Sequence, residues 1–300
     1  MYRIGIDLGG TNTVAGLVDE NGQILDRESR KTNLPTDLKR IVADIVALTH
    51  GLLARNGLSK EEIASVGVGV PCTANKKTGW MEDAHHLGFA GGPLVAPLME
   101  QLDIPVFIEN DANAAALGEW KGCGYEADSF ILVTLGTGIG GGILLGGRLI
   151  TGVNHAAGEL GHMTIAMDGE PCGCGRNGCF EAYGSASALI RHARDATGED
   201  ITEAKEVFAR ALAGEQVFVR VLDEYTTHVA VGLANLINIF GPEYICLGGG
   251  VSHAGDALLL PVREKTYQLM FAKAAEQKTQ IILAKLHNDA GILGAALLDN

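Results

Sequence analysis

The chain has 300 residues, of which 47% are hydrophobic and 20% charged, and this fits one large soluble domain or two of ordinary size. Its apolar stretches are broken by glycine or charge well before the ~20 residues that a membrane-spanning helix needs. The net charge of −13 argues against a nucleic-acid partner, because it would repel a phosphate backbone. The first residues have neither the basic nor the apolar region of a secretion signal, so we expect a cytoplasmic protein. Glycine is the outlier, since its 41 residues are about twice the usual share and predict many close backbone contacts.

The N-terminal residues predict a meander of three strands. Residues 3–8 alternate apolar with small or polar side chains, Gly9-Gly10-Thr11-Asn12 predicts a turn, and apolar residues return at 14–18 and 24–25. Apolar positions then follow helical spacing until Asn56-Gly57 stops them, so a helix is expected over 37–56.

Two strands and an alanine-rich helix are expected next. The strands cover 66–70 and 106–108, and the second leads into Glu109-Asn110-Asp111, which signals the N-cap of a helix ending near Gly122.

The layout of the first strands starts again near residue 130. Residues 130–133 predict a strand, Gly136 to Gly142 a turn, and residues 143–145 and 149–150 two more strands. Setting residues 7–11 over residues 134–138 aligns a strand end, a leucine and a Gly-rich turn, which suggests two related lobes.

Helices dominate the chain beyond residue 185. They are expected over about 185–197, 202–213, 215–240, 256–276 and 290–298, with strands over 244–247 and 281–284. Strands that alternate with helices indicate an α/β architecture with layered sheets, and no linker is long enough to separate independent modules.

The strongest local signal is a set of metal-binding side chains, His162, Cys172, Cys174 and Cys179. They supply the four nitrogen and sulfur ligands of a closed tetrahedral zinc site. Disulfides fit poorly, because the expected compartment is reducing and the cluster has an odd number of cysteines. An iron–sulfur cluster would usually need a fourth cysteine, so structural zinc is predicted.

Two Gly-rich turns at strand ends, residues 9–13 and 136–142, are candidates for wrapping phosphates with backbone N–H groups. Residues 136–141 also match the dinucleotide fingerprint, with Glu159 near the distance of a ribose-binding acid. That motif must open a helix, whereas a strand is expected here, so a Rossmann dehydrogenase is the less favoured interpretation. The alternative for both turns is a plain tight hairpin.

Several polar residues have an ordinary structural explanation that stays open at this point. Asp111 begins a helix, where capping alone explains an aspartate. Glu159 and Glu181 fit exposed loop acids, and His85-His86 fit surface or pocket histidines. The isolated cysteines fit small core residues, and they are Cys72, Cys123 and Cys246.

Taken together, five motifs in order along the whole chain resemble the ROK family of bacterial sugar kinases and sugar-responsive repressors. The motifs lie at residues 7–12, 109–114, 135–141, 159–162 and 172–179. The resemblance implies an α/β, two-lobe, actin-like (ribonuclease-H-like) fold with ATP and Mg²⁺ in a cleft between the lobes. We expect one lobe over 1–115, to which helix 289–300 returns, and a second lobe with the zinc loop over 116–288. A homo-oligomer, dimer or tetramer, is also expected.

The resemblance also implies the activity and the roles of single residues. The γ-phosphoryl group would pass to the 6-hydroxyl of an aldohexose, glucose first, with Asp111 as the general base. Sugar contacts would come from Asn110, Asp111, Glu159, His162 and Glu181. Asp7 would hold Mg²⁺ through water, and His162 would serve both zinc and sugar. The phosphate loops would be Gly9, Gly10, Thr11 and Asn12 with Thr137 and Gly138, and Gly248, Gly249 and Gly250 would form the turn beside the adenosine.

Two residues depart from the pattern of the family's glucose kinases, and they leave the identity of the sugar substrate open. Where the family's glucose kinases usually carry glycine after a proline, this chain has Cys72, and His86 stands where they carry an asparagine that contacts the sugar. An N-acetylhexosamine, or another aldohexose, is therefore the second choice of substrate. A catalytically silent sugar-binding regulator is a more remote alternative, because the repressors carry an N-terminal helix-turn-helix and this chain starts at a strand.

Overall fold

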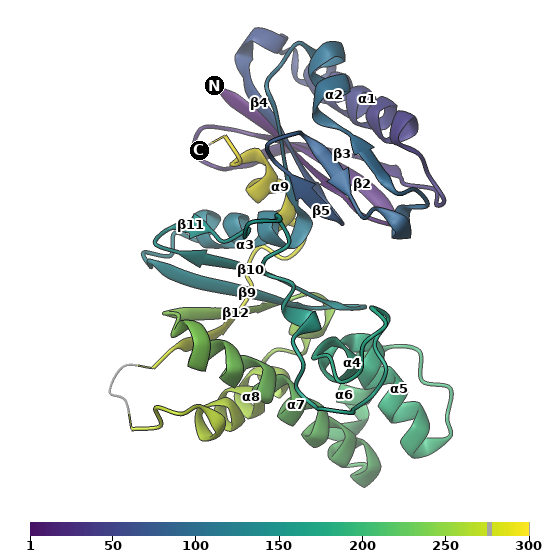
Figure 1. Ribbon diagram of the computed structural model, residues 1–300, viewed down its shortest axis with the longest axis vertical. Coiled ribbons are helices and arrows are strands. Elements are labelled where there is room, and N and C mark those ends of the chain that lie inside the picture. Colours follow the sequence, from purple (N-terminus) through teal and green to yellow (C-terminus); the bar gives the residue numbers. More distant parts are fainter. Residues whose placement is uncertain (275–277, 300) are drawn as a thin grey trace. The chain divides into compact units, whose positions relative to one another are not determined.

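The computed structural model describes residues 1–274 and 278–299, except for the side chain of His86. The chain forms two units, each built on a five-stranded mixed sheet (Figure 1). Unit 1 comprises Met1–Glu126, Leu149–Gly158 and Lys285–Asn300, and unit 2 comprises Ala127–Arg148 and Glu159–Ala284. Among the helices described, none combines the length and apolarity needed to cross a bilayer.

The sheet of unit 1 has the strand order β3-β2-β1-β4-β8. The bounds are β1 Tyr2–Leu8, β2 Asn12–Val18, β3 Ile24–Lys31, β4 Ile63–Val70 and β8 Val106–Asn110. β2 pairs antiparallel with both β1 and β3, so the predicted three-strand meander is confirmed. β1, β4 and β8 run parallel. β3 is longer than expected, because its later residues are polar and mostly exposed and gave no apolar signal.

The α-helices described in unit 1 have the bounds α1 Leu38–Asn56, α2 Val95–Leu102, α3 Asp111–Gly122 and α9 Asp289–Ala296. The helix predicted over 37–56 is confirmed as α1, with Asp37 as its cap, since the side chain accepts the Arg40 N–H at 2.9 Å. A small sheet was not expected, and its strands are β5 Thr73–Asn75, β6 Trp80–Glu82 and β7 Gly91–Pro93. Three-residue strands leave too few positions for a period to be recognised.

The two faces of the unit 1 sheet pack differently. Side chains alternate along a strand, so Ile4 and Ile6 of β1 point into the hydrophobic core with α1, while Gly5 faces α9. A side-chain carbon at Gly5 would clash with the backbone of Ile292, and one at Gly67 of β4 with the backbone of Ala295. The backbone of α9 therefore lies directly on β1 and β4, as the yellow helix in Figure 1 does. Part of the high glycine content is explained by these positions, where only a residue without a side chain lets α9 approach the sheet so closely.

Unit 2 repeats the strand layout of unit 1. Its order is β11-β10-β9-β12-β13, with bounds β9 Ser129–Leu135, β10 Ile139–Leu145, β11 Arg148–Leu149, β12 Tyr244–Gly248 and β13 Gln280–Leu283. β9 pairs antiparallel with β10 and parallel with β12, which pairs parallel with β13. The repeat predicted from the two Gly-rich turns is confirmed in layout. The lobe boundary expected at residue 115 falls inside α3, which runs on to Gly122.

The helices of unit 2 are α4 Glu181–Gly184, α5 Ala186–Thr197, α6 Ala204–Leu212, α7 Gln216–Phe240 and α8 Asp256–Leu269. α7 and α8 pack against one another beside β12 (Figure 1). The helix expected over 256–276 was too long, because the backbone is extended at Met270, and residues 275–276 lie outside the described residues. Similarly, α9 ends at Ala296, before the expected residue 298.

We predict that Gly67→Ala destabilises unit 1 by at least about 1–3 kcal/mol, the usual cost of overpacking, because the added methyl group meets backbone atoms that cannot rotate away. Gly69→Ala, two residues along the same strand, is the matched control. Its added carbon would lie 3.5 Å from Ala114 Cβ, an ordinary contact. Urea unfolding of both variants checks this, and equal free energies of unfolding would contradict the packing described for α9.

Candidate active site and metal cluster

Asp111 lies at the junction of β8 and α3, and its side chain is half-buried. The structure corrects the capping interpretation of this residue, because Asn110 is the cap. The Asn110 Oδ1 accepts the N–H groups of Ala112 at 2.9 Å and Asn113 at 3.1 Å. Asp111 Oδ1 accepts the Ala112 N–H at 2.8 Å from within the first turn. Its carboxylate thus lies at the positive end of the helix dipole, where anionic groups are stabilised.

Cys72, one of the two departures from the glucose-kinase pattern, lies close to this helix start. Its backbone carbonyl accepts the Asn110 Nδ2 at 3.4 Å. Burial and then the negative charge of Asp111 raise the pKa of the Cys72 thiol to about 12. Cys72 is therefore a neutral, buried neighbour of Asp111 at physiological pH.

The Gly-rich turn of unit 1 closes the β1–β2 hairpin. The Gly9 N–H donates to the Asn12 carbonyl at 3.0 Å, and the Thr32 hydroxyl donates to the Gly9 carbonyl at 2.6 Å. Gly10, Thr11 and Asn12 are exposed, so the tip of the turn is open to a ligand.

Asp7 stands at the base of the same hairpin. Burial raises the pKa of its carboxyl above the ordinary value. A carbon added at Gly291 of α9 would lie 3.1 Å from Asp7 Oδ2, so the glycine leaves space beside the carboxylate. A half-buried carboxylate with space next to it suits a hydrated divalent cation, whose charge would offset the desolvation.

In the Gly-rich turn of unit 2, residues 136–142, some backbone N–H groups donate hydrogen bonds within the protein and others do not. The Gly136 N–H donates to the Gly138 carbonyl, and the Gly140 N–H donates to the Thr134 hydroxyl at 3.1 Å. Among the described residues, the N–H groups of Thr137 and Gly138 have no acceptor. Two adjacent open amides are what a phosphate-binding turn requires.

The turn at residues 248–250 packs against the start of this second Gly-rich turn. Gly249 has φ +79°, and a side chain there would clash with the backbone of Leu135 at the end of β9. The Ser252 hydroxyl donates to the Gly249 carbonyl at 2.7 Å and fixes the turn. The structure therefore brings together two of the glycine segments that the resemblance assigned to the nucleotide.

The two acids beside the metal loop have different environments. Glu159 is exposed and precedes a 3₁₀ turn, Leu160–His162. Glu181 begins α4, and its Oε2 accepts the Ile139 N–H of the Gly-rich turn at 2.9 Å. The Cys172 Sγ lies 3.8 Å from Glu181 Oε1. Glu181 thus connects the Gly-rich turn to the metal loop.

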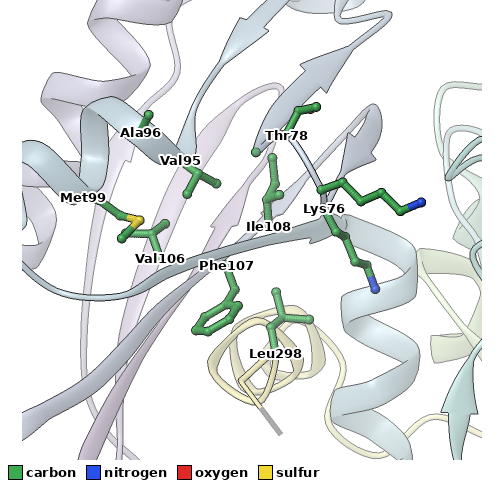
Figure 2. A pocket seen from close by; sticks show the side chains of 11 residues that line it. Lys76, Thr78, Val95, Ala96, Met99, Val106, Phe107, Ile108 and Leu298 are labelled. Atoms are coloured by element: carbon green, nitrogen blue, oxygen red, sulfur yellow. The ribbon is translucent and has the colours of Figure 1, made fainter.

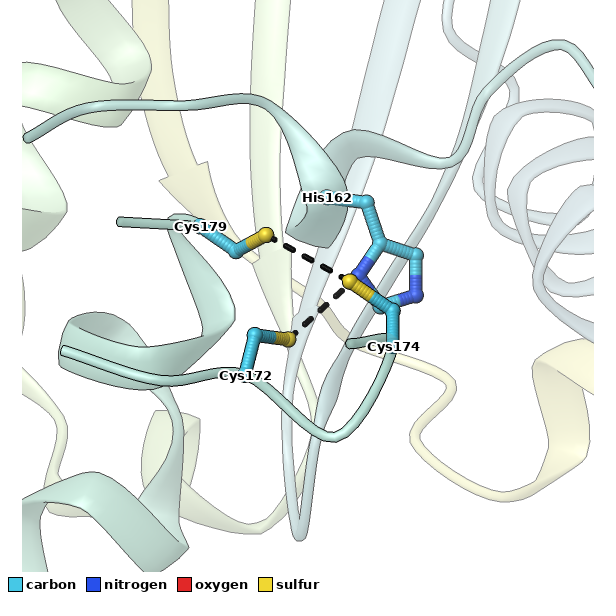
Figure 3. Close-up of side chains that lie close together, drawn as sticks. All are labelled: His162, Cys172, Cys174 and Cys179. Atoms are coloured by element: carbon cyan, nitrogen blue, oxygen red, sulfur yellow. Dashed lines mark hydrogen bonds between the residues drawn. The ribbon is translucent and has the colours of Figure 1, made fainter. Parts of the chain in front are cut away.

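The four residues predicted as metal ligands come together, and their ligand atoms all lie within 4.8 Å of one another (Figure 3). The Cys174 and Cys179 sulfurs are 3.6 Å apart, and Cys172 Sγ is 3.8 Å from His162 Nδ1. Ligands about 2.3 Å from a central ion lie about 3.8 Å apart at the corners of a tetrahedron. The geometry therefore fits a tetrahedral metal ion.

The charge state of the thiols makes metal binding depend on pH. Burial raises the pKa of Cys172 above its ordinary value and that of Cys179 to about 12. Backbone and side-chain hydrogen bonds from Arg176 lower the pKa of Cys174 to about 6. A metal ion binds thiolates, so it must displace protons from the two thiols with raised pKa values. Affinity for the metal therefore rises with pH.

The sequence analysis did not single out an ion pair at the end of β8, the strand that leads into Asp111. Glu109 is 1% exposed, and its Oε2 forms an ion pair with Lys76 Nζ. The available signal was a charged residue at the end of the buried strand Val106–Asn110, where a carboxylate needs a partner. The sequence does not point to Lys76 as that partner.

Known proteins resemble the whole chain. A glucokinase of Halalkalibacterium halodurans is 36% identical, with 99% of this chain and 94% of the relative covered. An N-acetylmannosamine kinase of Escherichia fergusonii is 32% identical, with 99% and 98% covered. The structure of a ROK family glucokinase from Streptomyces griseus in complex with glucose and AMPPNP is 36% identical, with a TM-score of 0.83 and 99% of each chain covered.

These similarities confirm the predicted two-lobe α/β fold and the resemblance stated from the five motifs. Residues 3–300 match the ROK family, and this chain belongs to the ROK family.

Proposed function

We propose that this chain is an ATP-dependent hexose kinase that transfers the γ-phosphoryl group of ATP to the 6-hydroxyl of glucose. The observation that carries the proposal is the position of Asp111, a carboxylate at the start of α3 whose helix is already capped by Asn110. The glucokinases among its relatives support the activity and make glucose the first choice.

Phosphoryl transfer asks a protein mainly for positioning and charge stabilisation. Asp111 accepts the proton of the sugar 6-hydroxyl as that oxygen bonds to the γ-phosphorus. The bond from the γ-phosphorus to the β–γ bridging oxygen breaks, and ADP leaves with that electron pair. The half-buried setting of Asp111 limits the access of water that would compete for the phosphoryl group.

Residues of both units are proposed for the nucleotide. The open amides of Thr137 and Gly138 and the exposed tip Gly9-Gly10-Thr11-Asn12 donate to phosphate oxygens. Asp7 would hold Mg²⁺ through water, and the ion, when bound, would neutralise part of the phosphate charge. The turn Gly248-Gly249-Gly250 lies on the adenosine side.

Sugar hydroxyls are proposed to contact Asn110, Asp111, Glu159, His162 and Glu181. The Nδ1 of His162 faces Cys172, and the other ring nitrogen points away from that thiol (Figure 3). One imidazole can therefore bind the metal and a sugar hydroxyl at once. This arrangement would couple the metal to sugar affinity.

The metal of the Cys172 cluster is proposed to be zinc. Three thiols and one imidazole in tetrahedral spacing are the ligand set of a closed structural zinc site. Zinc would fix the loop that carries His162, and no step of the reaction is assigned to it.

N-acetylmannosamine is the second candidate substrate, because an N-acetylmannosamine kinase aligns with nearly the whole chain at 32% identity. Cytoplasmic location and homo-oligomer formation remain predictions.

Release of ADP with ATP, Mg²⁺ and a panel of hexoses tests the function. We expect glucose to give the highest kcat/KM, followed by N-acetylmannosamine, N-acetylglucosamine or another aldohexose. Nucleotide turnover with none of these sugars, together with sugar binding by calorimetry, would reject the kinase in favour of a sugar-binding regulator.

Asp111→Asn should lower kcat by about 10²–10⁴-fold, because an amide cannot accept the hydroxyl proton. Sugar binding by calorimetry should change far less, since an amide still hydrogen-bonds a hydroxyl. Stability should hold, because Asn110 is the cap of α3. Asn110→Ala serves as the contrast, and loss of the cap should cost about 1 kcal/mol in urea unfolding. A near wild-type kcat for Asp111→Asn would remove the proposed base.

The purified protein should contain about one zinc per chain by elemental analysis, because closed four-ligand sites bind tightly. Cys174→Ala should lose the metal and raise the sugar KM while both sheets stay folded by circular dichroism. Cys246→Ala, a buried cysteine of β12 outside the cluster, is the control that should keep the metal. A metal-free protein with full activity and an unchanged melting temperature would exclude this role.

A further inference from the structure

A buried carboxylate, Glu109, lies on β8 two residues before Asp111 and has no part in the roles proposed so far. Glu109 is 1% exposed, and its Oε1 accepts two hydrogen bonds from the start of α3. One comes from the Asn110 N–H at 2.9 Å and the other from the Asn113 Nδ2 at 3.1 Å. Glu109 therefore fixes the backbone of Asn110, just before Asp111, and the buried side chain of Asn113 in the first turn of α3.

The other oxygen of this carboxylate is paired with a lysine. Lys76 Nζ forms an ion pair with Glu109 Oε2, and among the described residues no other cation pairs with this carboxylate. A buried carboxylate without a partner would be costly and would tend to rearrange or take up a proton. Lys76 thus keeps the carboxylate available as an acceptor for α3.

The turn that carries Lys76 is itself fixed. It follows β5, and the Asn75 Oδ1 accepts the N–H groups of Lys77 at 3.2 Å and Thr78 at 3.3 Å. The Asn75 Nδ2 donates to Glu82 of β6 at 2.8 Å. Lys76 is therefore presented to Glu109 from a turn held by the small sheet.

Open space adjoins this turn. A pocket of about 230 Å³ is lined by Lys76, by side chains of α2 and by Phe107 and Leu298 (Figure 2). A substitution at Lys76 therefore need not disturb close packing, so its effect reports the lost charge.

We infer that Lys76 and Glu109 form a positioning pair, in which Lys76 holds the Glu109 carboxylate and Glu109 fixes the backbone and first turn that orient Asp111. The inference rests on the proposed function, because it assigns the pair to the general base of that reaction. A displacement of a reacting group by about 1 Å can cost 10²-fold in rate, so a support of this kind affects kcat more than ATP binding.

Four variants test the pair. Glu109→Gln keeps an acceptor oxygen for Asn110, and we expect kcat within about fivefold of wild type. Lys76→Met leaves the buried carboxylate unpaired, and kcat should fall at least about tenfold with the KM for ATP within twofold. The double variant Lys76→Met/Glu109→Gln should recover to within about threefold of Glu109→Gln, because the unpaired charge is gone. Lys77→Met, the exposed neighbour in the same turn, should behave as wild type.

Recovery of kcat in the double variant separates a positioning effect from a general loss of stability. If Lys76→Met acted only by destabilising the fold, adding Glu109→Gln would lower the stability further and kcat would not recover. The pair is rejected if Lys76→Met equals Lys77→Met, or if the double variant is no better than Lys76→Met. If Lys76→Met does not fold, Lys76→Gln, which also removes the charge, takes its place in both the single and the double variant, and the double variant is again compared with Glu109→Gln.

Amide hydrogen exchange at Asn110 gives a readout that does not depend on turnover. The Asn110 N–H should exchange slowly in the wild type and in Glu109→Gln and at least about tenfold faster in Lys76→Met. A wild-type protein without activity on any hexose would reject the proposed function. An active wild type whose Lys76→Met variant keeps the wild-type kcat and exchange rate would reject the positioning pair alone.

Discussion

Unit 1 depends on direct contact between the backbone of α9 and three other elements. Gly5 and Gly67 let the helix touch β1 and β4, and a side chain at Gly294 would clash with the backbone of Ala114 in α3. Helices usually pack 8–10 Å apart through interleaved side chains, so glycine contacts of this kind fix position more tightly. The contact locates α3, and α3 in turn locates Asp111. The position of Asp111, the proposed base, therefore depends on glycine contacts of α9 that have no proposed role in binding substrate.

Buried or half-buried carboxylates that accept backbone N–H groups are a second recurring device. Glu119 of α3 is fully buried and accepts the N–H groups of Lys285 at 2.6 Å and Leu286 at 3.0 Å. Glu181 does the same for Ile139, and Glu109 for Asn110. Such charge-assisted hydrogen bonds are stronger than neutral ones and resist displacement by water. In this acidic chain, part of the negative charge therefore serves to hold loops and helix starts.

The sequence allowed the fold to be predicted well where signals were local. The metal ligands lie close together along the chain, and the Gly-rich turns repeat with their strands, so both could be recognised. From the sequence, capping remained an open explanation for Asp111, because Asn110 and Asp111 are both capping residue types, and only the geometry assigns the cap to Asn110. The small sheet of three-residue strands has no periodicity, and the pairing of Lys76 with Glu109 joins distant positions through that sheet. Tertiary contacts of this kind leave no pattern in the sequence.

The C-terminal origin of α9 has a consequence for synthesis. Arg3 of β1 binds the Asp299 carboxylate at 2.8 and 2.9 Å, and Ser65 donates to the same group at 3.0 Å. The first strand of unit 1 therefore gains this partner only after α9 has been made, whereas the described strands of unit 2 precede α9 in the chain. Domains generally fold as units during translation. Unit 2 can therefore complete its sheet before α9 exists, and until α9 has been made the nascent unit 1 exposes the sheet face that this helix covers.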